Sequence, residues 1–321
     1  MKNIAVLTSG GDAPGMNACV RAVTRTALGR GLSVTGVIRG YEGLIDDTMQ
    51  PLSRTDVSNI LQRGGTILHA ARSERFLEAG WRSVAASNLS KRGVDGLVVI
   101  GGDGSFHGAD LLAREHGMPL VGVPGTIDND LWGTDYTIGF DTAVNTALEA
   151  LDRIRDTAAA HDRLFIVEVM GRTAGFIALA AGIGAGAEAI LMPETRSDLD
   201  AIAAIVRARS AEGRRSSIIV VAEGDERGSA TQIAEELRVR EGLDCHATVL
   251  GHVQRGGSPT AQDRALAMKL GWASVEALLD GADACMIGEV AGRITRTPLP
   301  DTWMRRKELD AVLLKLAGLL V

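Results

Sequence analysis

The chain has 321 residues, of which 45% are hydrophobic and 23% charged, a composition typical of a soluble globular protein with about two domains. Its 40 acidic and 34 basic residues give a formal net charge of −6, which argues against general attraction to nucleic acids or membrane surfaces. Only 3% of the residues are aromatic and no apolar run is long enough to cross a bilayer, so the sequence predicts neither a base-stacking platform nor a membrane anchor.

Short apolar runs alternate with helical patterns along the whole chain. We expect strands, most of them rich in Val, Ile or Leu, over residues 4–7, 34–38, 96–100, 120–123, 164–169, 189–192, 218–222 and 248–250. We expect helices over residues 17–28, 109–115, 142–158, 199–211 and 232–240. Because apolar strands that alternate with helices form parallel sheets covered on both faces, the sequence predicts an α/β protein with doubly wound, mainly parallel sheets.

Three cysteines, Cys19, Cys245 and Cys285, are far apart and form no CxxC pair. This pattern indicates neither a disulfide framework nor a metal site, and we interpret them as buried residues. The residues before the first apolar run are too few for a signal peptide, so we expect a cytoplasmic protein.

A first glycine-rich loop follows the strand at 4–7. Gly10 and Gly11 allow backbone N–H groups to approach an anion, and the next helix adds the positive end of its dipole. An ordinary strand–helix turn has the same appearance, so this loop alone is weak evidence.

A second loop follows the strand at 96–100. Gly101, Gly102 and Gly104 leave room for a polyphosphate, and Asp103 is placed to hold its Mg²⁺. The alternative is that Asp103 only caps the next helix. The loop indicates a phosphoryl donor without indicating the acceptor.

A third loop, beginning at Val123 with the letters VPGTIDND, places two carboxylates at the end of an apolar strand. Asp128 is suited to accept the proton of an attacking sugar hydroxyl, which Thr126 would orient. Asn and Asp are also common turn formers, but turn formation does not explain why polar loops recur at strand ends.

The strings TSGGDAPGMN, IGGDGS, PGTIDND, VEVMGR and LGHVQRGGSP resemble the bacterial ATP-dependent 6-phosphofructokinase family (type A), in the same order and almost from end to end. The resemblance implies two Rossmann-like domains with the active site between them. The pattern of motifs sets a boundary near Gly139. We expect a nucleotide-binding domain of residues 1–139 plus about 254–304, and a sugar-phosphate domain of residues 140–253 plus about 305–321.

The resemblance also assigns roles to individual residues. It implies that the ATP site, with Mg²⁺ on Asp103, consists of Gly11, Arg72, Ser73, Gly102, Asp103, Gly104 and Ser105. It implies that catalysis rests on Asp128 as base, with Thr126, Asp130 and Arg172. Fructose 6-phosphate would contact the catalytic residues Thr126, Asp128, Asp130 and Arg172 together with Arg163, Met170, Gly171, Glu223, His246, His252 and Arg255. Arg163 would reach the 6-phosphate from a neighbouring subunit, which predicts a homotetramer.

An effector site at a subunit interface is a further implication. Relatives bind ADP or phosphoenolpyruvate at positions matched here by Arg21, Arg25, Arg54, Arg155, Arg214 and Arg215, with Glu188 at a metal-binding position. Glu212 stands where a lysine is usual, so the ligand and the direction of regulation stay open.

The donor is indicated by two glycines. The pyrophosphate-using branch has an aspartate and a lysine where this chain has Gly104 and Gly125. An aspartate at position 104 would crowd the α-phosphate of ATP, so the sequence favours ATP over pyrophosphate.

Some positions depart from the family. His246 replaces the usual arginine for the 6-phosphate, which predicts weaker binding of fructose 6-phosphate, another anionic ketose as acceptor, or a tolerated change. Ser73, Leu77 and His107 alter the expected adenine pocket and leave the choice of nucleotide open. A regulatory paralogue that binds its ligands but turns over poorly is the alternative from another class, and Asp103, Asp128 and Arg172 argue against it.

Overall fold

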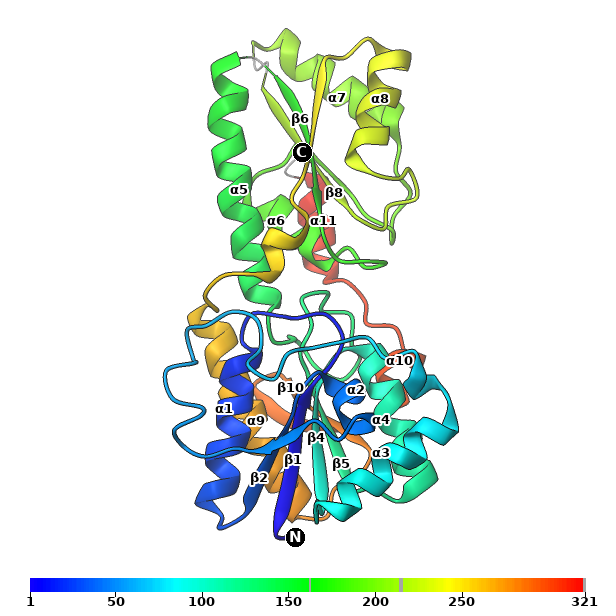
Figure 1. Cartoon of the computed structure of the whole chain (residues 1–321). Coiled ribbons are helices and arrows are strands. Elements are labelled where there is room, and N and C mark those ends of the chain that lie inside the picture. Colours follow the sequence, from blue (N-terminus) through cyan, green and yellow to red (C-terminus); the bar gives the residue numbers. More distant parts are fainter. Residues whose placement is uncertain (162, 214–215, 320–321) are drawn as a thin grey trace. The chain divides into compact units, whose positions relative to one another are not determined.

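The computed structural model describes residues 1–161, 163–213 and 216–319, and the chain divides into two compact units. Unit 1 consists of residues 1–127, 131–142 and 255–307. Unit 2 consists of residues 128–130, 143–254 and those from 308 onward. Figure 1 shows that each unit has its own sheet with helices on both faces.

The sheet of unit 1 has a parallel centre and antiparallel edges. Its strand order is β11–β10–β5–β4–β1–β2–β3, in which β3 and β11 run against their neighbours. The strands are β1 (Asn3–Thr8), β2 (Ser33–Val37), β3 (Met49–Pro51), β4 (Gly96–Gly101), β5 (Leu120–Pro124), β10 (Cys285–Val290) and β11 (Arg293–Pro298). Strands β1, β4 and β5 are buried throughout almost their whole length, as expected for a sheet covered on both faces.

Helices cover both faces of this sheet. Helix α1 (Met16–Gly29) packs against α9 (Ala261–Leu279) on one face. The other face carries α2 (Gly40–Ile45), α3 (Ala79–Lys91), α4 (Asp103–His116) and the 3₁₀ turn η1 (Arg75–Leu77) (Figure 1). Buried side chains such as Leu7, Val99, Phe106 and Leu112 form the core between sheet and helices. A short helix, α10 (Asp301–Met304), follows β11.

Unit 2 contains the parallel sheet β7–β8–β6–β9. Its strands are β6 (Leu164–Val169), β7 (Ala189–Leu191), β8 (Ser217–Ala222) and β9 (Cys245–Val249). Its helices are α6 (Phe176–Gly184), α7 (Leu199–Ala211), α8 (Ala230–Glu241) and α11 (Ala311–Leu319), with the 3₁₀ segment η2 (Gly251–Arg255) after β9. Helices α7 and α8 pack together, and α11 packs on α6. Ile166, Ile219, Val221 and Ile233 are central in its core.

Helix α5 (Phe140–His161) begins in unit 1 and continues in unit 2. Its first turn is capped from α9 by Asp263, whose carboxylate accepts hydrogen bonds from the backbone N–H groups of Gly139 and Thr142, both at 2.8 Å. Burial raises the pKa of Asp263, and these hydrogen bonds oppose that effect. The helix start is therefore fixed by a residue more than a hundred positions away.

The predicted class, α/β with mainly parallel sheets, is confirmed. The expected strand at 248–250 is wrong in its bounds, because β9 spans Cys245–Val249. The helix expected at 109–115 begins earlier, at Asp103. Within the described ranges, no helix combines the length and apolar character needed to span a membrane.

Candidate functional site

The predicted phosphate loops lie at one edge of the unit 1 sheet. Strands β1, β4 and β5 are parallel neighbours, so the loops after them share the carboxyl edge. Ser9 N–H donates to the Ile100 carbonyl and Gly125 N–H to the Gly101 carbonyl, both at 2.9 Å. A side chain on Gly102 would lie 3.6 Å from Thr126. The structure therefore brings together the glycine loops and Thr126, which the sequence had only placed at three strand ends.

Helix α4 starts inside the second loop. Gly102 occupies its N-cap position and Asp103 is the first helical residue, so Asp103 is not the cap. A carboxylate in the first turn is favourable for the helix dipole. The same positive helix end also favours an anion that binds beside it.

The two glycines that bear on the donor differ in their surroundings. Among the described residues, and apart from the backbone of α4 itself and the chain neighbours, no heavy atom lies within 4 Å of a Cβ placed on Gly104, so this position is open. At Gly125, a Cβ would lie 2.9 Å from Ile100 Cγ2 and 3.2 Å from Met16 Cε. A side chain at 125 therefore requires a change in the core, whereas one at 104 does not.

The expected adenine pocket is built on the 3₁₀ turn η1. Ser73 accepts a hydrogen bond from the Phe76 N–H at 3.2 Å, while Arg72 and Leu77 are exposed. The Phe76 ring stacks on Tyr41 with a centroid separation of 4.0 Å. Tyr41 donates a hydrogen bond to the Ser105 carbonyl, and burial raises the pKa of this phenol. The stacked Tyr41 and Phe76 rings, with the Tyr41 hydrogen bond, thus connect η1 with the start of α4.

Two residues at this pocket were missed by the sequence analysis. Arg82 is buried, and its Nη1 donates to the carbonyls of Phe76 and Leu77, both at 2.8 Å. The same guanidinium forms a bidentate pair with Glu115 of α4, with N–O distances of 2.7 and 2.6 Å. Trp303 of α10 stacks on the exposed His107 ring at 3.8 Å. No local motif marks either residue, because their partners are distant in sequence.

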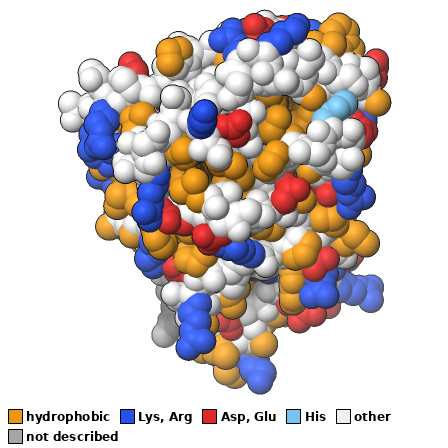
Figure 2. Space-filling view, turned by 90° about the horizontal axis from the view of Figure 1, so that it is seen from below, with side chains coloured by type: hydrophobic (Ala, Val, Ile, Leu, Met, Phe, Trp, Pro, Cys, Tyr) orange, Lys and Arg blue, Asp and Glu red, His pale blue; other side chains and the backbone are white. Residues whose placement is uncertain are grey.

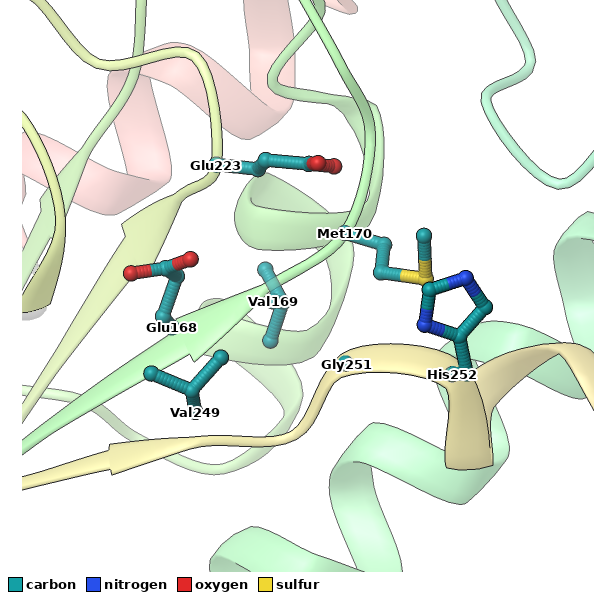
Figure 3. Close-up of a pocket in the computed structure, with 7 residues that line it drawn as sticks. All are labelled: Glu168, Val169, Met170, Glu223, Val249, Gly251 and His252. Carbon is teal, nitrogen blue, oxygen red and sulfur yellow. The ribbon is translucent and has the colours of Figure 1, made fainter.

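The acceptor residues gather at the carboxyl edge of the unit 2 sheet. They border a pocket of about 210 Å³ that is lined by Glu168, Val169, Met170, Glu223, Val249, Gly251 and His252. Figure 3 shows these residues, with Glu168 on β6 itself and Met170 on the segment that follows the strand. Glu168 accepts a hydrogen bond from the Ala230 N–H at the start of α8, so its role is structural. The predicted residues Met170, Glu223 and His252 are brought together.

The predicted catalytic pair is in contact within unit 2. Arg172 Nε lies 3.4 Å from Oδ2 of Asp128, and Asp128 is buried. The Arg172 backbone has φ 50°, a left-handed conformation, and its N–H donates to Glu223 Oε2 at 3.2 Å. Gln254, which the sequence analysis missed, is buried and accepts a hydrogen bond from the Met170 N–H at 2.9 Å. The turn that carries Met170, Gly171 and Arg172 is therefore held at two backbone N–H groups. Asp130, the second carboxylate of this loop, also belongs to unit 2.

Arg163 and His246 are not brought to this pocket within one chain. Phe165 pairs with His246 in the β6–β9 register, at the amino end of both strands, whereas the pocket lies beyond their carboxyl ends. At about 3.3 Å per residue, the length of β6 separates Arg163 from Met170 by roughly 20 Å. The His246 ring lies 5.4 Å from that of Phe165, and its Nε2 is 3.8 Å from Asp244.

Arg255 is found in unit 1, beside the nucleotide loop. A Cβ added to Gly11 would overlap Arg255 Nη1 and lie 3.0 Å from its Cζ. The guanidinium therefore rests against the backbone of Gly11. The resemblance implies that Arg255 contacts the sugar phosphate, and the structure adds a contact with the first glycine-rich loop.

The expected effector residues are divided between the units. In unit 2, Arg155 donates to the carbonyls of Ala185 and Gly186, both at 2.8 Å. Glu188 is buried, with Arg209 Nη2 at 2.8 Å and Arg155 Nη1 at 3.5 Å from its Oε1. Its Oε2 accepts a hydrogen bond from the Ile218 N–H. Arg209, which was not predicted, thus neutralises Glu188.

In unit 1, Arg21 and Arg25 lie one turn apart on α1, and Arg54 is exposed. Partial burial and, secondly, the charge of Arg25 lower the pKa of Arg21. The expected residues Arg214 and Arg215 lie outside the described residues.

No broad basic surface is visible on the face shown in Figure 2, where the described basic and acidic side chains are interspersed. Exposed ion pairs such as Arg30–Glu276 and Arg296–Asp280 also occur among the described residues. Anions on this chain are therefore more readily bound by loops and small groups of arginines than by a charged face.

The chain matches the phosphofructokinase family over residues 3–278. It is 57% identical over 320 residues to ATP-dependent 6-phosphofructokinase 1 of Thermus thermophilus, covering 100% of this chain and 99% of that protein. It is 50% identical over 318 residues to an ATP-dependent 6-phosphofructokinase of Cytophaga hutchinsonii, covering 99% and 97%.

Among solved structures, phosphofructokinase from Saccharomyces cerevisiae is 40% identical with a TM-score of 0.90. That match covers 94% of this chain, which spans only 45% of the yeast chain. A pyrophosphate-dependent phosphofructokinase from Marinobacter aquaeolei, at 24% identity and a TM-score of 0.85 over 100% of this chain and 92% of that one, shares the fold. On this evidence the chain belongs to the phosphofructokinase family.

Proposed function

We propose that this chain is an ATP-dependent 6-phosphofructokinase, which transfers the γ-phosphoryl group of ATP to the 1-hydroxyl of fructose 6-phosphate in glycolysis. The observation that carries the proposal is the identity of 57% over essentially the full length to a protein of that name. The clustered glycine loops of unit 1 and the Asp128–Arg172 contact of unit 2 support the same chemistry.

Unit 1 would hold the donor. The phosphates would lie against Gly11 and the segment from Gly102 to Ser105, with Arg72 beside them and the base near Ser73. The open space at Gly104 supports ATP rather than pyrophosphate as the donor. An Mg²⁺ ion, if bound with ATP, would neutralise charge that develops on the transferring oxygens.

Asp103 would hold that Mg²⁺. The described residues contain no cluster of three or more His, Cys, Asp or Glu side chains that would form a metal cage. Mg²⁺ on a nucleotide usually takes only one or two protein carboxylates and the phosphates themselves, so a single aspartate at a helix start fits the ion.

Unit 2 would hold the acceptor and the base. Asp128 would take the proton of the sugar 1-hydroxyl, assisted by Thr126 and Asp130, as the bond from O1 to the γ-phosphorus forms and the bond to the ADP oxygen breaks. A buried carboxylate carries its charge at lower cost beside a guanidinium, which the Arg172 contact supplies. Arg172 would then share in neutralising the transferring phosphoryl group.

The sugar would occupy the pocket lined by Met170 and Glu223, with Gly171 giving backbone access and His252 and Arg255 near the 6-phosphate. Arg163 and His246 lie too far along the sheet to reach this pocket in their own chain. We therefore propose that a second copy supplies both, in a homotetramer or at least a dimer.

The reaction is tested by initial rates with Mg-ATP and fructose 6-phosphate, run beside pyrophosphate as the donor. We expect saturable turnover with ATP and a loss of about 10²- to 10⁴-fold in kcat for Asp128→Asn, with the KM for ATP unchanged. Asp152→Asn, an exposed aspartate of α5, is the matched control. Unfolding protection by ATP without any product would contradict the proposal and favour a sensing paralogue.

The shared site is tested by mixing two inactive variants, Arg163→Ala and Asp128→Asn. A hybrid contains one site with Asp128 from the first variant and Arg163 from the second, so activity is expected to return on mixing. Mixtures that stay inactive although co-purification of differently tagged variants shows hybrid assembly would refute the second-copy assignment.

We further propose that an anionic effector such as ADP or phosphoenolpyruvate binds at a subunit interface, at a site formed by Arg21, Arg25, Arg54, Arg155, Glu188, Arg214 and Arg215. Glu188 is buried and already neutralised by Arg155 and Arg209, so we propose that this pocket works without a metal. Rates measured with and without each effector, at low fructose 6-phosphate, test the site. Arg155→Ala is expected to remove the response.

A further inference from the structure

The backbone turn after β8 runs past the turn that carries Arg172. Val169, the last residue of β6, pairs with Ala222, the last residue of β8, so both turns leave the sheet side by side. Glu223 N–H donates to the Val169 carbonyl at 2.9 Å, and the Glu223 side chain accepts a hydrogen bond from the Arg172 N–H. The two turns are thus joined on both sides of Glu223.

Arg172 is held in a backbone conformation that an arginine seldom adopts. Its φ of 50° is left-handed, and the preceding Gly171 has φ 144°. A side chain with a Cβ is disfavoured in this region, so the surrounding structure must impose it. The residues that enforce this conformation therefore also determine where the Arg172 side chain begins.

Gly224 provides the space that this conformation requires. A Cβ placed on Gly224 would overlap the carbonyl oxygen of Arg172 and would lie 3.0 Å from both the Arg172 carbonyl carbon and Thr173 Cα. These are backbone atoms, which cannot rotate away as a flexible side chain would. At position 224 any residue other than glycine therefore displaces one of the two turns.

The turn of Gly224 is anchored by a buried side chain. The next residue, Asp225, is buried and accepts hydrogen bonds from Ser197 Oγ at 2.6 Å and from the Arg227 N–H at 2.9 Å. Its own N–H donates to the Ala222 carbonyl at 3.0 Å. Arg172, by contrast, is exposed and has an unfavourable φ. A substitution at 224 therefore moves Arg172.

We propose that Gly224 is a positioning residue for phosphoryl transfer: by having no side chain, it keeps the Arg172 backbone where its guanidinium meets Asp128. The inference rests on the proposed function, since it takes Arg172 and Asp128 as the reacting pair. Gly224 itself touches neither substrate nor base, and its effect is transmitted through the Arg172 carbonyl. The donor site, which lies in unit 1, is not involved.

The test is Gly224→Ala, with Gly318→Ala as the matched control. Gly318 lies in helix α11 of unit 2 with no atom within 4 Å of an added Cβ. A shift of the order of 1 Å at a catalytic group costs about 10²-fold in rate. We expect kcat of Gly224→Ala to fall by about that factor, with the KM for ATP close to that of the parent. Gly318→Ala is expected to keep the parent kcat.

A double-mutant cycle separates positioning from a general structural role. In an Arg172→Ala background, Gly224→Ala is expected to lower kcat by less than about 2-fold, because the group that it displaces is already absent. If the double variant loses kcat by the product of the factors found for Gly224→Ala and Arg172→Ala alone, the proposal is overturned. An unchanged kcat in Gly224→Ala would also overturn it. If the parent itself does not phosphorylate fructose 6-phosphate, the proposed function fails instead, and the two failures are distinguishable.

If Gly224→Ala does not fold, Asp225→Asn provides a second variant, because it loosens the same turn while keeping its shape. We expect a several-fold loss of kcat that disappears in the Arg172→Ala background. A loss that persists in that background would refute the positioning role.

Discussion

Two arginine–glutamate pairs of unit 1 have nearly the same geometry but different burial, and their removal should therefore have different effects. Arg82 Nε and Nη2 lie 2.7 and 2.6 Å from Glu115, and Arg30 Nε and Nη2 lie 2.8 and 2.7 Å from Glu276. The Arg82 side chain is 5% exposed, whereas that of Arg30 is 54% exposed. The two pairs are of the same type but differ in the access of water, and Arg82 in addition donates to two backbone carbonyls.

Replacement of the buried arginine leaves several groups without a partner. Arg82→Ala leaves the Glu115 carboxylate without its arginine partner. It also removes the hydrogen-bond donor for the Phe76 and Leu77 carbonyls of η1. Breaking a buried ion pair costs about 3–5 kcal/mol, and Glu115 is 30% exposed, so we expect the lower end of that range. Removal of an exposed pair such as Arg30→Ala costs about 0–1 kcal/mol.

Thermal and denaturant unfolding of both variants provide the measurement. For a unit of this size we expect Tm to fall by about 6–12 °C in Arg82→Ala and by less than about 4 °C in Arg30→Ala. Because Arg82 also holds the η1 turn, the KM for ATP is expected to rise in Arg82→Ala only. Equal destabilisation by the two substitutions would refute the argument from burial, and an unchanged KM would refute the link from Arg82 to the nucleotide pocket.

The other predictions concern acid conditions and two positions in the proposed sites. Arg82 lowers the pKa of Glu115, so the stability from this pair is present above the ordinary carboxyl pKa and is lost as pH falls through the lowered value. The difference in unfolding free energy between the parent and Arg82→Ala should therefore become smaller in acid. A difference that does not change with pH would contradict this. Gly104→Asp should fold normally, since its side chain enters open space, but its KM for ATP should rise at least about 10-fold, and unchanged kinetics with ATP would disprove the donor argument. His246→Arg should lower the KM for fructose 6-phosphate about 10-fold through a charged hydrogen bond, and an unaltered KM would mean that position 246 does not meet the phosphate.

The sequence was sufficient to predict the central parallel strands, because runs such as Leu97–Ile100 are apolar throughout and end at glycine loops. It did not predict α9, whose buried residues lie almost all round the helix and are often small, as at Gly271, Ala273 and Ser274, so no 3.6-residue stripe is visible. Helix α3 was missed for a related reason, since it buries the polar residues Arg82 and Asn88. Hydrophobic periodicity does not reveal a helix in which the buried positions are not the apolar ones.

The candidate site was predictable only where its chemistry is local. The glycine loops and the Asp128 segment are contiguous strings whose residue types indicate phosphate binding and proton transfer. Arg82, Arg209, Gln254 and Gly224 have no such signal, because each acts on a backbone or side chain that is distant in sequence. Their roles depend on the register of the sheets and the packing of helices, which the sequence patterns do not specify.

The different surroundings of Gly104 and Gly125 predict the order in which substitutions that change the phosphoryl donor can be acquired. An aspartate at 104 enters open space, so a single substitution there is tolerated by the fold at once. A lysine at 125 meets Ile100 and Met16, so smaller residues must first replace one or both. A lineage that passes from ATP to pyrophosphate is therefore expected to acquire the first change early and the second only after its core has been altered. Intermediate sequences with an aspartate at 104 and a glycine at 125 should fold, whereas the reverse combination should be rare.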